Sequence, residues 1–465
     1  MLSAHAVGDI RAAEEALAAT LPDGELMRRA ARGLADHLDL IPAGDVVLCL
    51  IGPGNNGGDA LYAAVHLLDR GVRVDLCLLE EAKVHAGGLA AATAAGAQVV
   101  RAPGAQRWCL DAIFGIGARP GLSGKAAEWA GWIDERRPYV WAVDVPSGVD
   151  VDGATVPSAA VRADATVTFG THKAALLADP AAALAGTVTL VDIGLDPHLP
   201  APLIEVVEAS DGHLLDDVLP VATSHKYARG VLGIAAGSEQ YAGAAHLCVA
   251  GAQAGLAGMI RFVGSAELSR RVVDRAPEVV AGRGRVQAWV VGPGSGDDAA
   301  SQLAVALEDQ VPVVVDASAL QHLPQTFDVP ALLTPHAGEL AEMLGTGRES
   351  VEADPLGHAT AAAQRWNATV LLKGRRTVVA RAGAPSRVNR SGSAWLGTAG
   401  AGDVLAGFAG SLMAAGLDPL DAGSVAAYLH GVASVRANPD GPVVATDVAH
   451  ELPATVAAFV QGSLA

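Results

Sequence analysis

Short apolar runs recur along this chain, and a stretch with helical spacing follows most of them. The first run is the segment 45–51, after which come a glycine-rich turn (52–59) and a helical pattern (60–70). A continuous apolar run indicates a strand buried on both faces, as in a parallel sheet. Strand, turn and helix repeated at this spacing predict α/β layers. A chain of 465 residues is too long for one hydrophobic core, so we expect more than one α/β domain.

The expected strands fall into two series, separated by a segment with three prolines (195–202) that breaks any regular element. Strands are expected near residues 73–79, 98–100, 109–114, 139–143, 165–169 and 188–191 before this break, and near 230–236, 259–263, 288–291, 311–315, 331–334, 369–373 and 377–381 after it. Two helices are expected within residues 6–40, and two more at 402–416 and 419–437. The pattern predicts two three-layer αβα domains, residues 1–208 and 209–465.

Charge and composition exclude several classes of protein. The net charge of −18 argues against a nucleic-acid or anionic-membrane partner, because both require clustered Lys and Arg. The N-terminus lacks a basic segment followed by an apolar one, and no uncharged run is long enough to span a bilayer. The four cysteines have no CxxC spacing, which is typical of buried, reduced thiols. We expect a cytoplasmic enzyme that acts on small-molecule substrates and forms a homo-oligomer.

The segment 397–403 combines three glycines with Asp403 and precedes an apolar helical pattern. A glycine-rich loop before a helix presents free N–H groups and the positive end of the helix dipole, which favour an anion. A carboxylate at the same end would compete with a bound phosphate. We therefore expect backbone amides to hold phosphate charge, while Asp403 acts as a base on a substrate hydroxyl.

The first glycine-rich turn fits the dinucleotide fingerprint G-x-G-x-x-G at Gly52, Gly54 and Gly57, with Asp75 about twenty residues further on. Two features count against that interpretation. Asp59 falls in the first helical turn, where it would repel a pyrophosphate, and residues 55–56 add two amide side chains that a pyrophosphate does not need.

Similar polar residues follow two later strands of the first series. Ligands bind at the carboxyl ends of strands in an open parallel sheet, so Asn56, Asp111 and Ser147 could converge there as hard oxygen ligands of a cation. Each of the three, taken alone, is also typical of an ordinary turn or helix cap. Lys173 follows another strand and could be a catalytic residue, as an acid or as a charge partner of Asp144, or else an exposed lysine.

The segments 53–59, 111–117 and 143–148 closely resemble the NAD(P)H-hydrate epimerase domain, in the same order and spacing over residues 1–205. The resemblance implies a Rossmann-like domain that interconverts the R and S forms of NAD(P)HX at C6 of the hydrated nicotinamide ring, with Asp144 as an acid–base residue. It implies substrate contacts at Asn55, Asn56, Gly57, Gly58, Asp59, Gly115, Ile116, Gly117, Ala118, Arg119, Pro120, Gly121 and Asp144. It also implies a potassium ion held by Asn56, Asp111 and Ser147. Ala60 departs from the glycine that the family often has.

Nearly every expected strand of the second series ends in glycine or polar residues, which indicates a shared ligand cleft. The turn 373–377 and the loop before Asp403 would suit a nucleotide, with adenine and ribose near Lys373 and phosphates over residues 399–402. The P-loop pattern is absent. His336 has no second His or Cys nearby in sequence, which argues against a zinc-type site.

The second series resembles the ribokinase-like superfamily and, more narrowly, the ADP-dependent NAD(P)H-hydrate dehydratase, over residues 220–465. The shared segments are 225–230, 237–238, 292–294, 334–339 and 400–407. The resemblance implies contacts of magnesium-bound ADP with Lys373, Gly374, Arg375, Arg376, Thr377 and Gly402, and of NAD(P)HX with Ala244, Gly294, His336 and Asp403. Ser393 stands where the family commonly has asparagine.

These expectations describe a bifunctional enzyme that epimerises NAD(P)HX and dehydrates the S form to NAD(P)H, converting ADP to AMP and phosphate. Phosphate is a far better leaving group than hydroxide, so phosphoryl transfer to the C6 hydroxyl would make the dehydration possible. Three alternatives remain open. The chain could be a ribokinase-superfamily kinase that releases a phosphorylated product, its first domain could be a non-catalytic binding module, or that domain could be a dinucleotide-binding dehydrogenase domain.

Overall fold

The computed structural model describes residues 1–464. In it the chain forms two compact units. One unit is Ser3–Ile204, and the other combines Met1–Leu2 with the chain from Glu205 onward. Both units are built of helices and largely parallel sheets, as the alternating pattern predicted.

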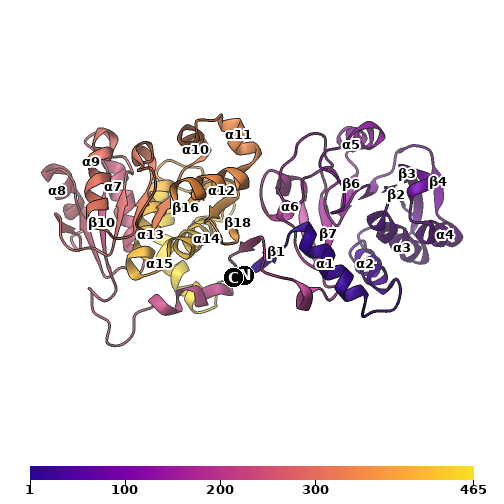
Figure 1. Ribbon diagram of the computed structural model, residues 1–465, viewed down its shortest axis with the longest axis horizontal. Coiled ribbons are helices and arrows are strands. Elements are labelled where there is room, and N and C mark those ends of the chain that lie inside the picture. Colours follow the sequence, from indigo (N-terminus) through magenta and orange to yellow (C-terminus); the bar gives the residue numbers. More distant parts are fainter. Residues whose placement is uncertain (465) are drawn as a thin grey trace. The chain divides into compact units, whose positions relative to one another are not determined.

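The first unit contains a seven-stranded, wholly parallel sheet in the order β4-β3-β2-β5-β6-β7-β8 (Figure 1). The strands are β2 (Val46–Ile51), β3 (Arg73–Leu78), β4 (Gln98–Val100), β5 (Trp108–Ala112), β6 (Tyr139–Val143), β7 (Ala165–Phe169) and β8 (Thr187–Val191). The strand order reverses between β2 and β5. At such a switch point the loops diverge, and a crevice opens at the carboxyl ends of the strands.

Helices cover both faces of this sheet and enclose two separate cores. They are α1 (Val7–Ala18), α2 (Glu25–Asp36), α3 (Asn55–Asp69), α4 (Ala86–Ala95), α5 (Gly124–Arg136) and the short α6 (Ala174–Leu177). The core on one face includes Leu34 of α2 and Leu61 of α3, and the core on the other includes Trp129 and Ile133 of α5. The two helices expected within residues 6–40 are α1 and α2.

The second unit contains an eleven-stranded sheet in the order β1-β9-β18-β17-β16-β15-β14-β13-β10-β11-β12. The strands are β1 (Leu2–Ala4), β9 (Ile204–Val206), β10 (Val231–Ala235), β11 (Met259–Phe262), β12 (Val280–Ala281), β13 (Ala288–Val291), β14 (Val313–Val315), β15 (Ala331–Leu333), β16 (Thr369–Leu372), β17 (Thr377–Ala380) and β18 (Ser386–Asn389). The strands from β16 to β12 are parallel, whereas β17 and β18 are antiparallel to their neighbours. The long apolar strands lie where the sequence predicted them, and the short β1, β9, β12 and β18 were not predicted.

Most helices of the second unit, which Figure 1 labels, are rich in alanine. They are α7 (Ala242–Gln253), α8 (Ala266–Arg275), α9 (Ala299–Glu308), α10 (Ala337–Leu344), α11 (Arg348–Ala353), α12 (Pro355–Trp366), α13 (Ala401–Ala415), α14 (Pro419–Ala437) and α15 (Ala445–Val460). Helices α7 and α13 pack backbone to backbone, because a Cβ at Gly407 would overlap the carbonyl oxygen of Cys248 and one at Gly251 would overlap that of Val404. This packing fixes the position of the α13 N-terminus.

Two predictions about the whole chain can be compared with the structure directly. Cys49, Cys77, Cys109 and Cys248 are all buried and free of disulfides, as expected. Of the helices that the structure describes, none has the length and hydropathy needed to cross a membrane.

Candidate active sites

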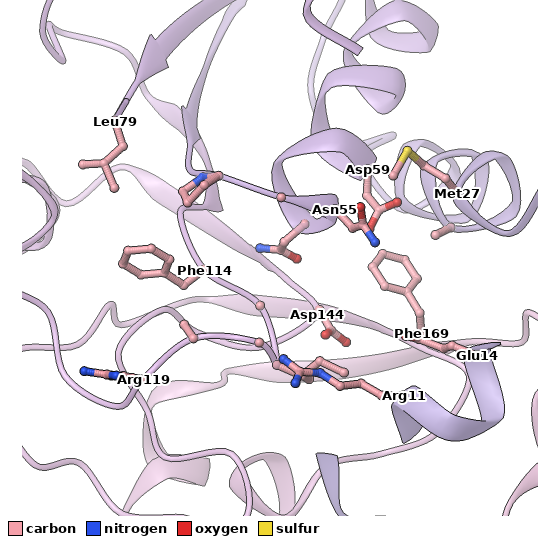
Figure 2. Close-up of a pocket in the computed structure, with 18 of the residues that line it drawn as sticks. Arg11, Glu14, Met27, Asn55, Asp59, Leu79, Phe114, Arg119, Asp144 and Phe169 are labelled. Carbon is pink, nitrogen blue, oxygen red and sulfur yellow. The ribbon is translucent and has the colours of Figure 1, made fainter. Parts of the chain in front are cut away.

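A cavity of about 1180 Å³ opens at the carboxyl ends of the strands in the first unit (Figure 2). Its walls come from α1, α2, the start of α3 and the loops after β2, β5 and β6. The two central loops touch, since a Cβ at Gly52 would overlap the carbonyl oxygen of Ile113. The cavity therefore lies at the switch point, where an open parallel sheet binds its ligands.

The glycine-rich turn after β2 supplies one wall of the cavity. Gly54 has a positive φ of 83° and caps α3, so residues 55–59 form the first turn of this helix. Asn55, Asn56 and Asp59 line the cavity. Gly57 and Gly58 are buried beneath them and let the helix start pack closely on Gly52 and on Met27. Three of the five predicted contacts in this turn thus face the cavity.

The loop after β5 supplies the opposite wall. Residues 115–119 and Gly121 line the cavity, and Pro120 does not. A Cβ at Gly115 would come within 3.0 Å of the Asn56 amide, so the two walls meet at this glycine.

Asp144 follows β6 and faces the cavity on an unusual backbone, with a φ of 72°. A left-handed conformation costs a residue other than glycine about 1–3 kcal/mol, and such strain clusters at functional sites. Lys173 is 1% exposed and its Nζ lies 2.6 Å from Asp144 Oδ1. The same ammonium also donates to Thr168 Oγ1 and to the Phe169 carbonyl oxygen. Lys173 is therefore a buried charge partner of Asp144, not an exposed lysine.

Asp111 and Ser147, two of the three predicted cation ligands, are in direct contact. Ser147 Oγ donates to Asp111 Oδ1 at 2.6 Å, and the Ser147 backbone N–H donates to Asp111 Oδ2 at 2.8 Å. In the amide orientation that satisfies both partners, the Asn56 side-chain nitrogen donates to the Val143 carbonyl oxygen and the side-chain oxygen accepts from the Gly115 N–H. All three side chains therefore lie around the start of the β5 and β6 loops.

Burial raises the pKa of Asp111 to about 6, although its hydrogen bonds with Ser147 oppose the rise. Asp111 is fully buried, and the structure gives it no lysine or arginine partner within residues 1–464. A carboxylate without a cationic partner, surrounded by hydroxyl, amide and backbone oxygens, fits a hard monovalent cation. The described residues contain no group of three His, Cys, Asp or Glu arranged for a transition metal.

Sequence reasoning missed Glu14 of α1, which lines the same cavity as Asp59 and Asp144. Burial and the charge of Asp144 raise the pKa of Glu14, while Lys173 and Arg11 oppose this rise. Burial raises the pKa of Asp59 well above its usual value, and Asp144 and Glu14 add to the effect. The helical spacing of α1 showed that one face is buried, but not that Glu14 borders a cavity.

In the second unit, the glycine and polar segments that follow β10, β13, β14, β15 and β16 lie at the carboxyl ends of neighbouring strands. Lys373 directly follows β16, and its Nζ lies 2.9 Å from Asp316 Oδ1 and 3.7 Å from Glu339 Oε2. Thr334 Oγ1 donates to the same Asp316 oxygen at 2.9 Å. Sequence reasoning assigned no role to Asp316 or Glu339, because their ion pairs join segments far apart in the chain.

Asp403 lies in the first turn of α13, two residues after N1. Gly400 caps the helix with a φ of 86°, and a Cβ at Gly402 would lie 3.5 Å from Lys373 Nζ. Burial and the charge of Asp316 raise the pKa of Asp403 to about 6, and Lys373 opposes this rise. The structure thus places three features close together: the free N–H groups at the start of α13, the Lys373 ammonium and the Asp403 carboxyl group, which has no ion-pair partner among the described residues.

The pKa of Lys373 is raised as well. Burial alone would lower it, but the charges of Asp316, Glu339 and Asp403 outweigh burial. Lys373 is therefore a fixed cation beside the α13 N-terminus. Of the other predicted nucleotide contacts, residues 374–376 lie in the turn between β16 and β17, where Gly374 and Arg375 are exposed, and Thr377 is the first residue of β17.

The predicted substrate contacts Ala244 and Gly294 adjoin each other, since a Cβ at Gly294 would approach that of Ala244 at 2.6 Å. His336 caps α10: its Nδ1 accepts from the Glu339 N–H at 3.1 Å, while Glu339 Oε2 accepts from the His336 N–H. The His336 side chain is 59% exposed. The cap holds Glu339 toward Lys373 and leaves the imidazole edge open to a ligand.

Comparison with known proteins gives matches for both units. Residues 232–454 match the family described as NAD(P)H-hydrate dehydratase, and residues 23–175 match the one described as YjeF-related protein N-terminus. The chain is 42% identical to a Bifunctional NAD(P)H-hydrate repair enzyme Nnr from Mycobacterium leprae, over 94% of this chain and 95% of the relative. It is also 42% identical to the Mycobacterium tuberculosis protein of the same name, over 89% of each chain.

A crystal structure of a ribokinase-like superfamily protein from Enterococcus faecalis resembles part of this chain, with a TM-score of 0.50 and 22% identity. The match covers 57% of this chain and 99% of that protein. This likeness shows that the chain contains a ribokinase-like fold.

Proposed function

This chain belongs to the family of bifunctional NAD(P)H-hydrate repair enzymes, and we propose that its two sites carry the two successive steps of that repair. The first unit interconverts the R and S forms of NAD(P)HX. The second unit dehydrates the S form to NAD(P)H, at the expense of ADP, which becomes AMP and phosphate.

In the epimerase site, Asp144 is the base that handles the C6 hydroxyl of the hydrated nicotinamide. The buried Lys173 ammonium holds this carboxylate in the cavity wall through an ion pair of 2.6 Å. The walls formed by residues 55–59 and 115–121 flank the cavity and would hold the rest of the dinucleotide. A cavity of about 1180 Å³ is large enough for such a ligand.

A potassium ion would be held by Asn56, Asp111 and Ser147. Bound there, it would supply a positive charge that lets the buried Asp111 stay ionised. Asp111 and Ser147 would then join the loops after β5 and β6, and Asp144 lies three residues before Ser147. We infer that this arrangement keeps the strained backbone of Asp144 in place.

In the dehydratase site, Asp403 takes the proton from the C6 hydroxyl of S-NAD(P)HX. The alkoxide attacks the terminal phosphoryl group of magnesium-bound ADP, and AMP leaves. Electron donation from the ring nitrogen then expels phosphate, and loss of a proton from C5 restores the double bond of the dihydronicotinamide. The N–H groups at the start of α13 and the Lys373 ammonium stabilise the phosphate charge throughout.

The predicted contacts suit these assignments. Lys373, residues 374–377 and Gly402 would hold the nucleotide, and Ala244, Gly294 and His336 would hold the hydrated cofactor. The observation that carries this proposal is Asp403 itself. It is the carboxylate at the α13 N-terminus, and its pKa of about 6 suits a base near neutral pH.

One experiment separates this proposal from a small-molecule kinase with a non-catalytic first domain. The protein is incubated with mixed NADHX epimers, ADP, magnesium and potassium, and the absorbance of reduced nicotinamide is followed. Full recovery of NADH with release of phosphate and AMP is expected. A stable phosphorylated product, or recovery of only the S fraction, would contradict the dehydratase or the epimerase assignment respectively.

A further inference from the structure

Three carboxyl groups from separate parts of the chain line the epimerase cavity: Glu14 of α1, Asp59 of α3 and Asp144 after β6. Figure 2 shows Asp59 on one side of the Phe169 ring and Asp144 and Glu14 on the other. Only Asp144 has so far been given a chemical role, and Asp59 was expected only to contact the substrate.

The three groups differ in their partners. Asp144 has the buried Lys173 at 2.6 Å and a hydrogen bond from Thr168 Oγ1 at 3.0 Å. Asp59 and Glu14 make no hydrogen bond and no ion pair with any residue in the range 1–464. Burial without a donor or cation favours the protonated form of Asp59, whereas Lys173 and Arg11 favour the charged form of Glu14.

The charges around Asp59 favour the same state. Burial raises its pKa well above the usual value, and Asp144 and Glu14 raise it further. Lys173 faces Asp144, and Arg11 of α1 acts on Glu14.

Other charged and titratable groups lie nearby without pairing with Asp59. His85, at the start of α4, packs on Gly58 and accepts the Gly88 N–H. Arg119, Glu80 and Lys125 also line the cavity, and the Lys125 ammonium donates to the Leu78 carbonyl oxygen. The cavity therefore contains one carboxylate paired with a lysine and one carboxyl group that can donate a proton.

The reaction needs both states. When the C6–N1 bond of the hydrated ring opens, a base removes the hydroxyl proton and the O–H electron pair forms the C=O bond. The C6–N1 electron pair goes to N1, which takes up a proton from an acid. Rotation of the aldehyde and the reverse proton transfers close the ring with the other configuration at C6. No oxidant, reductant or further reactant is consumed.

We propose, on the basis of the epimerase function above, that Asp59 is the acid that protonates N1 during ring opening and recovers the proton on closure. Asp144 handles the hydroxyl proton at the same time. Glu14 is a positioning residue, because its charge keeps Asp59 protonated without contact with the reacting atoms. Two carboxyl groups in one site whose environments hold them in opposite protonation states are a recurring arrangement in acid–base catalysis.

The first test is Asp59→Asn, which keeps the size and a hydrogen-bond donor but cannot transfer a proton. Its kcat for interconversion of the NADHX epimers should fall by about 10²-fold or more. Its affinity for NADHX, measured by titration calorimetry, should stay within a few-fold of the wild-type value. Wild-type turnover by Asp59→Asn would overturn the proposal. So would a loss that lies wholly in binding, since Asp59 would then only contact the substrate.

The second test uses Glu14→Gln, with Glu15→Gln on the exposed side of the same helix as its matched control. An acid catalyst must be protonated, so kcat should decline as pH rises through the pKa of Asp59. Removal of the neighbouring negative charge lowers that pKa, and the decline in Glu14→Gln should move to lower pH by about half a unit or more. The Glu15→Gln profile should match the wild type. Identical profiles for all three proteins would overturn the proposal.

These outcomes are distinguishable from a failure of the proposed function. If the wild-type protein does not interconvert the epimers, the epimerase function itself is wrong and this inference falls with it. If the wild type does so, and Asp144→Asn is impaired while Asp59→Asn is not, the epimerase function stands and only the role of Asp59 is wrong.

Discussion

The two sites of this protein each place an aspartate beside a lysine that follows a strand, but they connect the charges differently. In the first unit, Lys173 pairs directly with Asp144, the candidate base, at 2.6 Å. In the second unit, Lys373 pairs with Asp316 at 2.9 Å, and the candidate base Asp403 makes no ion pair within the described chain.

The consequence is a difference in what each lysine holds. The Lys173 ammonium holds the Asp144 carboxylate directly. Lys373 holds Asp316 instead, and burial together with the charge of Asp316 raises the pKa of Asp403 to about 6. Ring opening at C6 needs a base and an acid in one cavity, whereas phosphoryl transfer needs one base and fixed positive charge for the phosphates. The lysine therefore supports the base in one site and the phosphates in the other.

The sharpest test of this contrast replaces Asp403 and Asp144 by asparagine, one at a time. Asp403→Asn should lower dehydratase turnover by about 10²–10⁴-fold, the size expected for a general base, and should leave epimerisation unchanged. Asp144→Asn should do the reverse. Each variant serves as the control for the other, and both activities are measured on each protein by separating the epimers and NADH chromatographically. Loss of both activities in either variant would contradict independent sites.

Lys173→Met sharpens the comparison further. Without the ammonium, the Asp144 carboxylate loses the buried partner that holds it in the cavity wall, so epimerisation should fall by about 10²-fold at neutral pH. The dehydratase rate is the internal control. An epimerase rate near that of the wild type would show that Lys173 has only a structural role.

The pH dependence of the dehydratase tests the state of Asp403. A base with a pKa of about 6 is protonated and inactive below that pH, so kcat/KM should rise with pH through about 6 and then level off. Asp316→Asn removes a like charge and frees Lys373, and both changes should move this rise to lower pH by about one unit. Glu342→Gln on an exposed position of α10 is the matched control. A rise at the same pH in all three proteins would contradict the proposed coupling.

The smallest expected effect concerns the potassium site. The folded pKa of Asp111 is about 6, above its ordinary value of 3.8, so the folded state binds more protons between these values and stability falls as pH rises through them. The loss is on the order of 3 kcal/mol. Potassium beside the ionised carboxylate should offset this loss.

Calorimetry of the full chain checks this prediction. Potassium chloride, compared with tetramethylammonium chloride at equal concentration, should raise the unfolding temperature more at pH 8 than at pH 5. In Asp111→Asn the difference between the two pH values should disappear. Equal stabilisation at both pH values would argue against a cation at this carboxylate.

The sequence predicted the central parallel strands, such as β2 and β13, because each is a continuous apolar run followed by a glycine turn. It did not predict β18. Arg387 of this strand is buried and forms ion pairs with Glu205 and Asp421, and no local sequence pattern reveals these partners. Residues at strand ends of one sheet, such as Asn56 and Asp111 in the first unit, could be placed together because parallel strands end at one edge of a sheet. Glu14 and Asp316 could not be assigned, because their roles depend on which distant side chains face them.

The most direct test of the account starts from pure R-NADHX with ADP, magnesium and potassium. The wild-type protein should return all of it to NADH. Asp403→Asn should produce a mixture of R and S forms without NADH, and Asp144→Asn should leave nearly all of the R form unchanged. Rapid recovery of NADH by either variant would contradict the assignment of one acid–base site to each step.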